Sequence, residues 1–297
     1  LVDSLSYREQ ISDVSYGRNH QSEIWGYYGQ PTPGYSNDTH QLQIPLMSGD
    51  VVSNLTSGIY DEDQTITMTT NNSEGIIYYT TDGSKPVLTS NIYTSPIFTG
   101  GNTIIRARTI EPNKLPGKIS TFTYLISSQN SIPTVSLIVE PDFLWDDNIG
   151  IYSNEYKQRE IPITLHYIKN GFNTSFEIDA GARLGGLNIW TKPQKPFTIY
   201  TRNRFGEDAI YYQLFENKPI ANFSRIVLRN GGDDWEETLI RDPMIESIAE
   251  GMLDCGYMAY TPSSIYLNGD YWGIYNIREK FDKNYFTQNF SVNGENI

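Results

Sequence analysis

The chain contains one cysteine, Cys255, and three histidines among its 297 residues. A single cysteine excludes an intrachain disulfide, and its place on an expected helix indicates a small buried hydrophobic residue rather than a nucleophile. The histidines, His20, His40 and His166, lie too far apart in sequence to indicate a zinc site. We therefore expect no metal ligands in this segment.

Long hydrophobic runs and basic stretches are also missing. No run approaches the roughly 20 apolar residues that a membrane-spanning helix needs, so we expect no membrane span here. The net charge of −13 argues against a nucleic-acid partner. No signal peptide is present, yet the chain begins with Leu1 and stops at Ile297. We interpret it as an internal fragment of a longer protein, so missing signals carry little information.

Aromatic residues, by contrast, are abundant. They make up 13% of the chain, with 22 tyrosines, while charged residues reach only 19%. Tyrosine and threonine favour strands over helical bundles. We expect a mainly β chain with some α+β character, divided into two or three domains.

Residues 1–44 are polar and end in the Pro- and Gly-rich stretch Gln30–Asn37, which indicates a domain edge or linker. The segment Ile11–Arg18, followed by Trp25-Gly26-Tyr27, resembles the closing strand and tail of lamin-tail-like domains. Most of such a domain would then lie upstream. The alternative is a disordered leader.

Residues 45–127 show short alternating strands separated by Asp82-Gly83 and Gly100-Gly101, a pattern typical of a β-sandwich. The block Tyr78–Pro86, with Ser95-Pro96-Ile97 after it, resembles the immunoglobulin-like C-terminal domain of chitobiases and β-hexosaminidases. The resemblance implies a spacer or accessory module. Tyr78 and Tyr79 are either core residues or a platform for sugars.

From residue 128 to 297 the pattern changes to longer strands and one clear helix. Strands are expected over 132–139, 161–167 and 175–180. The helix is expected to begin with Asp242 as N-cap and Pro243 in its first turn, and to close at Gly256. Its apolar positions recur with helical period and should pack on the sheet. They are Ile245, Ile248, Ala249 and Met252.

The segment 265–279 predicts a tight hairpin. Asn268-Gly269 favours a type I′ turn, so Ile265–Leu267 should pair with Tyr271–Ile277. Strand alternation then puts Tyr271, Gly273 and Tyr275 on one face, with a gap at the glycine. This outline suits a flat ligand between two rings, and ordinary sheet packing is the alternative.

A glycine-rich turn over Gly181–Asn188 is followed by Lys192 and Lys195. Backbone N–H groups of such a turn can approach phosphate oxygens, which a lysine on the next strand can reach. A plain tight hairpin gives the same pattern.

Three elements together resemble the CotH (spore-coat protein H) family of atypical secreted kinases. They are the glycine turn with its lysine strand, the run Leu228-Arg229-Asn230-Gly231-Gly232-Asp233 ending in Ile240-Arg241-Asp242, and Tyr271-Trp272-Gly273-Ile274-Tyr275 continuing to Glu279 and Asp282. Pro196 departs from the family pattern and leaves open whether Lys195 or Lys192 contacts phosphate. We favour Lys195.

The resemblance implies an α+β, sheet-rich small lobe of an atypical kinase, which is truncated here. It implies ATP and Mg²⁺ as cofactors of the full-length protein and none for this fragment. Tyr275 is then the stacking candidate, and Glu279 is a polar contact to the nucleotide, a partner of Lys195 or a surface ion pair. The residues assigned to nucleotide binding are Lys195, Arg183, Gly185, Gly186, Tyr275 and Glu279.

The expected function is phosphoryl transfer from ATP to protein hydroxyls in the full-length protein, at the cell surface or outside the cell. Its partners would be protein substrates or cell-surface and coat proteins. The catalytic acids are expected beyond Ile297, so the fragment alone should be inactive. The alternative is a non-catalytic module for surface adhesion or for cell-wall and spore-coat assembly.

Overall fold

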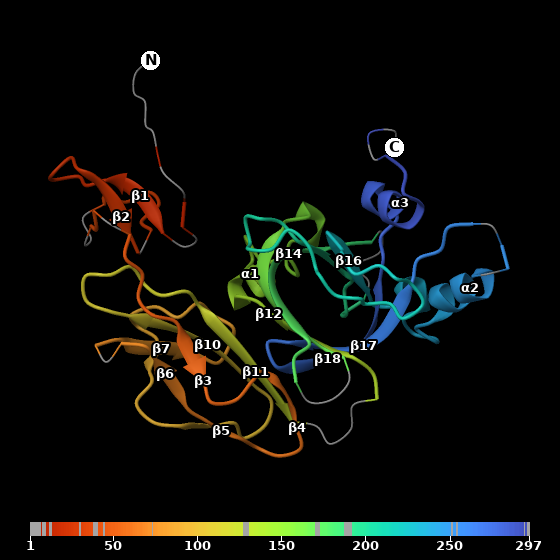
Figure 1. Cartoon of the computed structure of the whole chain (residues 1–297), viewed down its shortest axis with the longest axis horizontal. Coiled ribbons are helices and arrows are strands. Elements are labelled where there is room, and N and C mark those ends of the chain that lie inside the picture. Colours follow the sequence, from red (N-terminus) through yellow and green to blue (C-terminus); the bar gives the residue numbers. More distant parts are fainter. Residues whose placement is uncertain are drawn as a thin grey trace.

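The computed structural model of the chain is shown in Figure 1. The described residues are 7, 10–11, 14–29, 31–37, 41–43, 45–72, 74–126, 131–169, 173–186, 192–250, 252–253, 255–293 and 295. They form, in chain order, a short hairpin, a β-sandwich and a closed β-barrel to which helices are attached.

The N-terminal hairpin pairs β1 (Ser15–Arg18) with β2 (Trp25–Tyr28) in antiparallel fashion. Its aromatic rings gather on one face, where Tyr16 lies 5.7 Å from Trp25 and 5.0 Å from Tyr27 between ring centroids. A small aromatic sheet therefore stands in the region expected to be either a polar leader or the closing strand and tail of a lamin-tail-like domain.

The sandwich consists of a five-stranded sheet in the order β4-β11-β10-β7-β8 and two short pairs, β3 with β6 and β5 with β9. The strands are β3 Val51–Ser53, β4 Gly58–Tyr60, β5 Thr65–Ile66, β6 Met68–Thr70, β7 Ile76–Thr80, β8 Asn91–Ile92, β9 Ile97–Phe98, β10 Thr103–Ile110 and β11 Ser120–Ile126. Tyr79 packs against the sandwich core, whereas Tyr78, on the opposite face of β7, is 9% exposed, so neither ring is freely exposed as a platform. The predicted immunoglobulin-like, β-rich fold is confirmed.

Seven strands close into a barrel in the order β12-β13-β14-β15-β16-β18-β17. They are β12 Thr134–Ile138, β13 Ile161–Ile168, β14 Phe176–Leu184, β15 Phe197–Tyr200, β16 Arg225–Arg229, β17 Tyr260–Leu267 and β18 Asp270–Arg278. Neighbouring strands run antiparallel except β12 and β17, whose parallel pairing closes the barrel. The prediction of a sheet-rich α+β fold is confirmed, whereas its closure into a barrel was not predicted.

The barrel interior is a single apolar core. Alternate residues of each strand point inward, as Leu137 on β12, Leu165 on β13 and Ile199 on β15 do, and all three are fully buried. Their neighbours in sequence point outward and meet solvent, the helices or the sandwich. The alternation therefore separates an apolar interior from an outer face that carries polar residues.

Three helices join the barrel among the described residues: α1 (Pro141–Trp145), α2 (Arg241–Ala249) and α3 (Lys283–Phe290). The Asp282 side chain caps α3 by accepting hydrogen bonds from the backbone N–H groups of Asn284 and Tyr285, at 2.8 and 3.1 Å. Helix α3 therefore begins shortly after Glu279, with an acidic N-cap of the usual kind.

Helix α2 corrects three expectations, one of them being its end, which lies at Ala249 instead of at Gly256. It begins at Arg241, so Asp242 lies in the first turn instead of at the N-cap, and the apolar face expected to pack on the sheet is exposed. Ile245 is 57% exposed, Ile248 59% and Met252 76%. The physical reason is an acidic stripe on the opposite side of the helix.

Acidic residues recur every fourth position of α2 and turn this stripe toward the barrel. Asp242 pairs with Arg229 at 2.5 Å, and Glu246 pairs with the almost fully buried Arg278 at 2.6 Å. Glu250, just after the helix, accepts a hydrogen bond from the Tyr257 hydroxyl at 2.8 Å. These contacts orient α2 by ion pairs and hydrogen bonds and leave its isoleucines outside.

The predicted hairpin between β17 and β18 is present, and its turn has the expected backbone. Asn268 and Gly269 have φ angles of 50° and 90°, as a type I′ turn requires. The register, however, shifts beyond the turn: Tyr266 pairs with Tyr271, but Ile265 pairs with Gly273. Trp272 is therefore the extra residue of a β-bulge.

The bulge makes the predicted shared face of Tyr271 and Tyr275 wrong. One extra residue reverses the alternation, so Tyr271 is 56% exposed and stacks edge-on against Tyr266, while Tyr275 is fully buried in the barrel. The two rings do not flank a common gap.

The sandwich packs directly on the outer face of the barrel (Figure 1). Ile59 and Leu125 of the sandwich form a buried apolar cluster with Ile168 of β13. The Asn268-Gly269 turn also reaches the sandwich, because Asn102 donates a hydrogen bond to the Gly269 carbonyl at 3.2 Å. Strand β12, through the hydrogen bond between Ser136 and Thr123, joins β13 and the hairpin turn in one interface with the sandwich.

Candidate functional site

The six residues assigned to nucleotide binding lie at three separate places on the barrel. Gly185, Gly186 and Lys195 lie at one end, with Tyr275 in the core beneath them. Arg183 points outward from β14. Glu279 lies at the opposite end, where β18 leaves the barrel.

Lys195 is 6% exposed and precedes β15. Its ammonium lies 5.7 Å from the centre of the Tyr152 ring and donates a hydrogen bond to the Lys192 carbonyl at 3.3 Å. Lys192 itself pairs with Glu236 at 2.6 Å and lies 5.3 Å above the Trp235 ring. Both lysines therefore sit among aromatic rings at this end of the barrel.

The glycine turn begins as predicted. The Gly185 N–H donates to the Pro196 carbonyl at 3.0 Å, and Gly186 has a φ of 108°, which favours glycine. Leu187 and Asn188, also assigned to this turn, lie outside the described residues.

Tyr275 offers no ring face to a ligand in this structure. Its side chain is fully buried, and its hydroxyl donates to the Lys195 carbonyl at 3.2 Å. Burial raises the pKa of the phenol well above its ordinary value, so the hydroxyl keeps its proton. Tyr275 thus fixes the backbone that carries Lys195.

The gap at Gly273 is filled by a protein side chain. A Cβ at this position would lie within 3 Å of the Gln194 carboxamide, which donates a hydrogen bond to the Trp272 carbonyl at 2.6 Å. Gln194 also accepts from the Trp235 indole N–H at 2.7 Å. The glycine therefore allows close approach of Gln194, as interior strand glycines often do for a neighbouring group.

Arg183 points away from the glycine turn. Its guanidinium pairs with Glu160 at 2.9 Å and lies 5.2 Å from the centre of the Tyr200 ring, on the outer face of the barrel. It does not meet Lys195 or Glu279.

Glu279 forms a buried ion pair with Lys218, a residue that the sequence alone did not single out. The two charged atoms are 2.5 Å apart, and the side chains are 4% and 7% exposed. Glu279 also accepts hydrogen bonds from the Ala259 N–H at 2.8 Å and from Asn289 at 2.9 Å. Its partner is therefore neither Lys195 nor a neighbouring surface residue.

The ammonium of Lys218 has a complete set of acceptors. Besides Glu279 it donates to the Tyr257 carbonyl at 2.9 Å and to Asn289 at 2.7 Å. The Tyr257 ring centre lies 4.3 Å away and that of Tyr285 5.1 Å away. Three hydrogen bonds and two rings compensate the cost of removing this charge from water.

A cavity of about 320 Å³ opens beside this ion pair, between α3 and two loops. It is lined by Asn217, Lys218, Pro219, Ile220, Cys255, Gly256, Tyr257, Tyr285, Gln288, Asn289 and Phe290. Cys255 is exposed here, not buried as expected, because α2 ends at Ala249 and the cysteine lies in the following loop. Aromatic walls with a few polar groups are typical of small-molecule sites.

The tyrosines of this cavity keep their protons. Burial, together with the Glu250 carboxylate, raises the pKa of Tyr257 to about 12. Burial, together with the charge of Glu279, raises the pKa of Tyr285 to about 12. Both hydroxyls are therefore hydrogen-bond donors at neutral pH.

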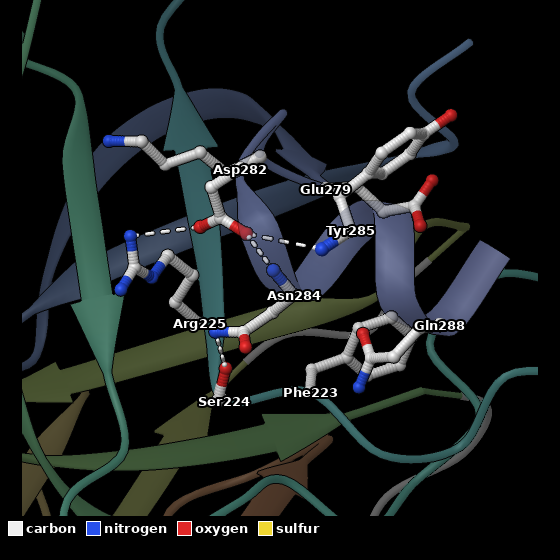
Figure 2. A pocket seen from close by; sticks show the side chains of 9 residues that line it. Phe223, Ser224, Arg225, Glu279, Asp282, Asn284, Tyr285 and Gln288 are labelled. Carbon is white, nitrogen blue, oxygen red and sulfur yellow. Dashed lines mark hydrogen bonds and ion pairs between the residues drawn. The ribbon is translucent and has the colours of Figure 1, made fainter. Parts of the chain in front are cut away.

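A smaller polar recess lies on the other side of α3 (Figure 2). There Asp282 lies between Arg225 and the start of α3, with an ion pair of 2.8 Å to Arg225. Glu279, Tyr285 and Gln288 also line this recess (Figure 2). Because Lys218 lines the larger cavity, the ion pair joins the walls of the two openings.

Lys195 and Glu279 are separated along the barrel. Arg278 pairs with Val227, which pairs with Thr198, so Glu279 follows at about the level of Ile199, which at strand spacing is roughly 13 Å beyond Lys195. Among the described residues, no group of three or more His, Cys, Asp or Glu side chains could hold a metal ion.

In the part of the chain that the structure describes, no helix combines the length and apolarity that crossing a membrane requires. An endoglucanase from Clostridium saccharobutylicum is 38% identical over 65 residues, which are 22% of this chain and 13% of the endoglucanase. The chain thus covers only a small part of that relative's length.

Two family models match, each over part of the chain. Residues 55–121 match the chitobiase/beta-hexosaminidase C-terminal domain, and residues 185–297 match the CotH kinase protein family. The first segment covers most of the sandwich, and the second begins at the glycine turn and includes α2, α3 and both ends of the barrel. In this order along the chain, the protein is similar to the accessory domain of chitobiases and then to CotH kinase proteins.

Proposed function

We propose that this chain supplies the nucleotide-binding part of a CotH-like protein kinase that transfers a phosphoryl group from ATP to protein hydroxyls in the complete protein. The observation that carries the proposal is the buried Lys218–Glu279 ion pair beside a cavity, within the segment that matches CotH kinase proteins. Protein kinases hold a lysine against a glutamate in this manner at the nucleotide.

The cavity beside the ion pair suits the proposed ligand. The rings of Tyr257, Tyr285 and Phe290 offer apolar surface to a base. The three N–H groups of Lys218 already have protein acceptors, so its positive charge would attract phosphate oxygens electrostatically, and direct contact would require it to exchange one of these acceptors. Glu279 would then hold the lysine in position. Mg²⁺, when bound with ATP, would neutralise charge that develops on the phosphates.

Gly185, Gly186 and Lys195 remain a second proposed phosphate-binding segment. They lie toward the other end of the barrel from Lys218, so we treat the two positions as alternative phosphate sites. Variants of the two lysines therefore distinguish the two positions.

The test is ATP binding in the presence of Mg²⁺, measured by calorimetry on the whole chain. The variant Lys218→Met/Glu279→Met removes both buried charges at similar volume, so the fold should persist, and we expect at least a tenfold loss of affinity. Lys195→Met tests the glycine turn. Lys118→Met, an exposed lysine of the sandwich, is the control.

If the folded wild-type chain binds no nucleotide, the proposal fails and a non-catalytic role in surface adhesion or coat assembly is favoured. If Lys195→Met alone abolishes binding, the nucleotide lies at the glycine turn instead. The resemblance to CotH proteins also leads us to propose a location at the cell surface or in a spore coat, with coat or surface proteins as partners.

A further inference from the structure

Four arginines gather on the outer face of the barrel and form what we term the arginine cluster. Arg183 comes from β14, Arg202 and Arg204 follow β15, and Arg225 begins β16. Their side chains are 37%, 43%, 60% and 29% exposed, in that order. Each therefore keeps part of its donor surface open to solvent.

One nearly buried carboxylate holds three of these arginines together. Glu160, whose side chain is 4% exposed, pairs with Arg183 at 2.9 Å and with Arg202 at 3.0 Å, and also contacts Arg204. Burial works to raise the pKa of Glu160, but the three guanidiniums outweigh it and lower the pKa below its usual value. Glu160 therefore stays ionised at neutral pH and holds the three guanidiniums together from below the surface.

The ring of Tyr200 lies close to three guanidiniums of the cluster, two of which also pair with Glu160. The guanidinium carbons of Arg183 and Arg202 both lie 5.2 Å from the Tyr200 ring centre, and that of Arg225 lies 5.0 Å away. Phe205 packs over Gly181, where a Cβ would lie 2.5 Å from the ring, and this contact holds the loop of Arg202 and Arg204 against β14. The cluster is therefore ordered before any ligand arrives.

The cluster carries more positive charge than its partners neutralise. Among the described residues its ion pairs are with Glu160 and Asp282, so four guanidiniums face two carboxylates and two positive charges remain. Asp179 and Asp208 lie outside these ion pairs and keep their negative charges, since they accept hydrogen bonds from the neutral hydroxyls of Thr164 at 2.7 Å and Tyr211 at 2.9 Å. This excess is concentrated on a protein whose net charge is −13.

We propose that the arginine cluster binds the phosphoryl group of a phosphorylated protein segment, through Arg202, Arg204 and Arg183. A phosphate monoester carries a charge of about −1.5 to −2 at neutral pH, which matches the uncompensated charge of the cluster. Guanidiniums present planar pairs of N–H donors that suit phosphate oxygens.

Charge and shape select this ligand over other anions. Three guanidiniums held close together by Glu160 can be contacted at once by one compact dianion, whereas a long acidic polymer would be repelled by a protein whose net charge is −13. The site is an open wall instead of a closed cavity, so a phosphoryl group presented on a peptide can reach it. Arginine clusters are a common means of recognising phosphorylated segments.

The experiment measures fluorescence anisotropy of an otherwise neutral peptide with one phosphoserine, at physiological ionic strength, on the whole chain. The same peptide with serine or with glutamate in that position provides the comparison. We expect the phosphopeptide to bind at least tenfold more tightly than either. In Arg202→Gln/Arg204→Gln that affinity should fall at least tenfold, while Glu160 keeps Arg183 as its partner.

Two controls separate this proposal from others. Arg18→Gln removes an exposed arginine of the N-terminal hairpin and should leave phosphopeptide affinity unchanged. Lys218→Met/Glu279→Met should also leave it unchanged, so failure of nucleotide binding and failure of this site are told apart.

Three outcomes would overturn the proposal: equal binding of the glutamate and phosphoserine peptides, unchanged affinity in the double arginine variant, or displacement by inorganic phosphate at the concentration at which the phosphopeptide itself saturates. The last would identify a free-phosphate site instead of a peptide site.

Discussion

The ammonium of Lys218 shows how one residue is stabilised by a partner far along the chain. Sixty-one positions separate it from Glu279, and the pair is buried at 2.5 Å. Removing one member of a buried pair leaves an uncompensated charge, which costs more than the pair contributes. A substitution of either residue alone is therefore expected to destabilise the fold.

We predict that Glu279→Ala destabilises the protein by about 3–5 kcal/mol, because Lys218 stays buried without its carboxylate. Lys218→Met/Glu279→Met should recover most of this loss by removing both charges. Urea unfolding of the two variants and the wild type measures the difference. Equal destabilisation by the single and double variants would contradict this interpretation.

Asp234 gives a prediction for pH. The hydrogen bond from the Thr238 hydroxyl, together with the Arg241 N–H and guanidinium, outweighs burial and lowers its pKa to about 2. A carboxyl with a lowered folded-state pKa adds stability above its unfolded pKa, near 3.8, and loses it as the pH falls toward 2. Stability should therefore decline between about pH 4 and pH 2.

Asp234→Asn should flatten this decline, since an amide does not titrate. Thermal midpoints of wild type and variant, measured in steps from pH 5 to pH 2, make the comparison. If both lose stability in parallel over this window, other carboxyls govern the acid response.

For single residues, the sequence identified side chains that could take part in binding, but it did not identify the residues that they contact. The glutamate of the β18 motif was recognised, yet its lysine was not, because no local spacing links Lys218 to Glu279. Arg183 was assigned by its place before the glycines. Strand alternation turns its side chain outward, opposite to Ala182 and Leu184, which are buried inside.

Among the elements, the β17–β18 hairpin combines a predictable turn with an unpredictable bulge. Asn268-Gly269 determines the turn locally, whereas the bulge at Trp272 depends on contacts across the barrel. Trp272 lies 6.0 Å from Trp145 and 5.9 Å from Tyr152 between ring centres. Tertiary packing therefore overrides the two-residue period at this position.

We predict that Gly273→Ala is destabilising by roughly 1–3 kcal/mol, for two reasons. Gly273 has a φ of 119°, which alanine tolerates poorly, and the new methyl group would collide with Gln194. Gly273→Ala/Gln194→Ala should relieve only the collision. Chemical unfolding of both variants tests this, and full recovery in the double variant would exclude a contribution from backbone strain.

Helix α2 shows why periodicity alone cannot assign the buried face. Its isoleucines and its acids both recur with helical spacing, on opposite sides. The acids face the barrel because Arg229 and Arg278 lie there, one on β16 and one on β18. Only the position of these arginines in the folded sheet decides between the two orientations.

In the whole molecule, the sandwich and the barrel form one unit through a small apolar cluster. Ile59, Leu125 and Ile168 are 2%, 1% and 0% exposed, although each lies on the outside of its own domain. Interfaces of this kind couple the unfolding of neighbouring domains when they are well packed.

We predict that Ile168→Ala uncouples the unfolding of the two domains. It should also lower the free energy of unfolding by about 2–5 kcal/mol, the usual range for truncating a buried isoleucine to alanine. Calorimetry should show one transition for the wild type and two for the variant. Phe98→Ala, at a position 65% exposed on the sandwich, is the control and should behave as the wild type does. A single unchanged transition in Ile168→Ala would show that the cluster does not couple the domains.

The β17–β18 hairpin has a mechanical consequence for the whole molecule. Its turn is bonded to the sandwich through Asn102, while its other end carries Glu279 and leads into α3. A pull on the sandwich would load the two strands along their length, where many backbone hydrogen bonds share the force in shear. Tension applied to the sandwich would thus be transmitted along the hairpin to the cavity at the far end of the barrel.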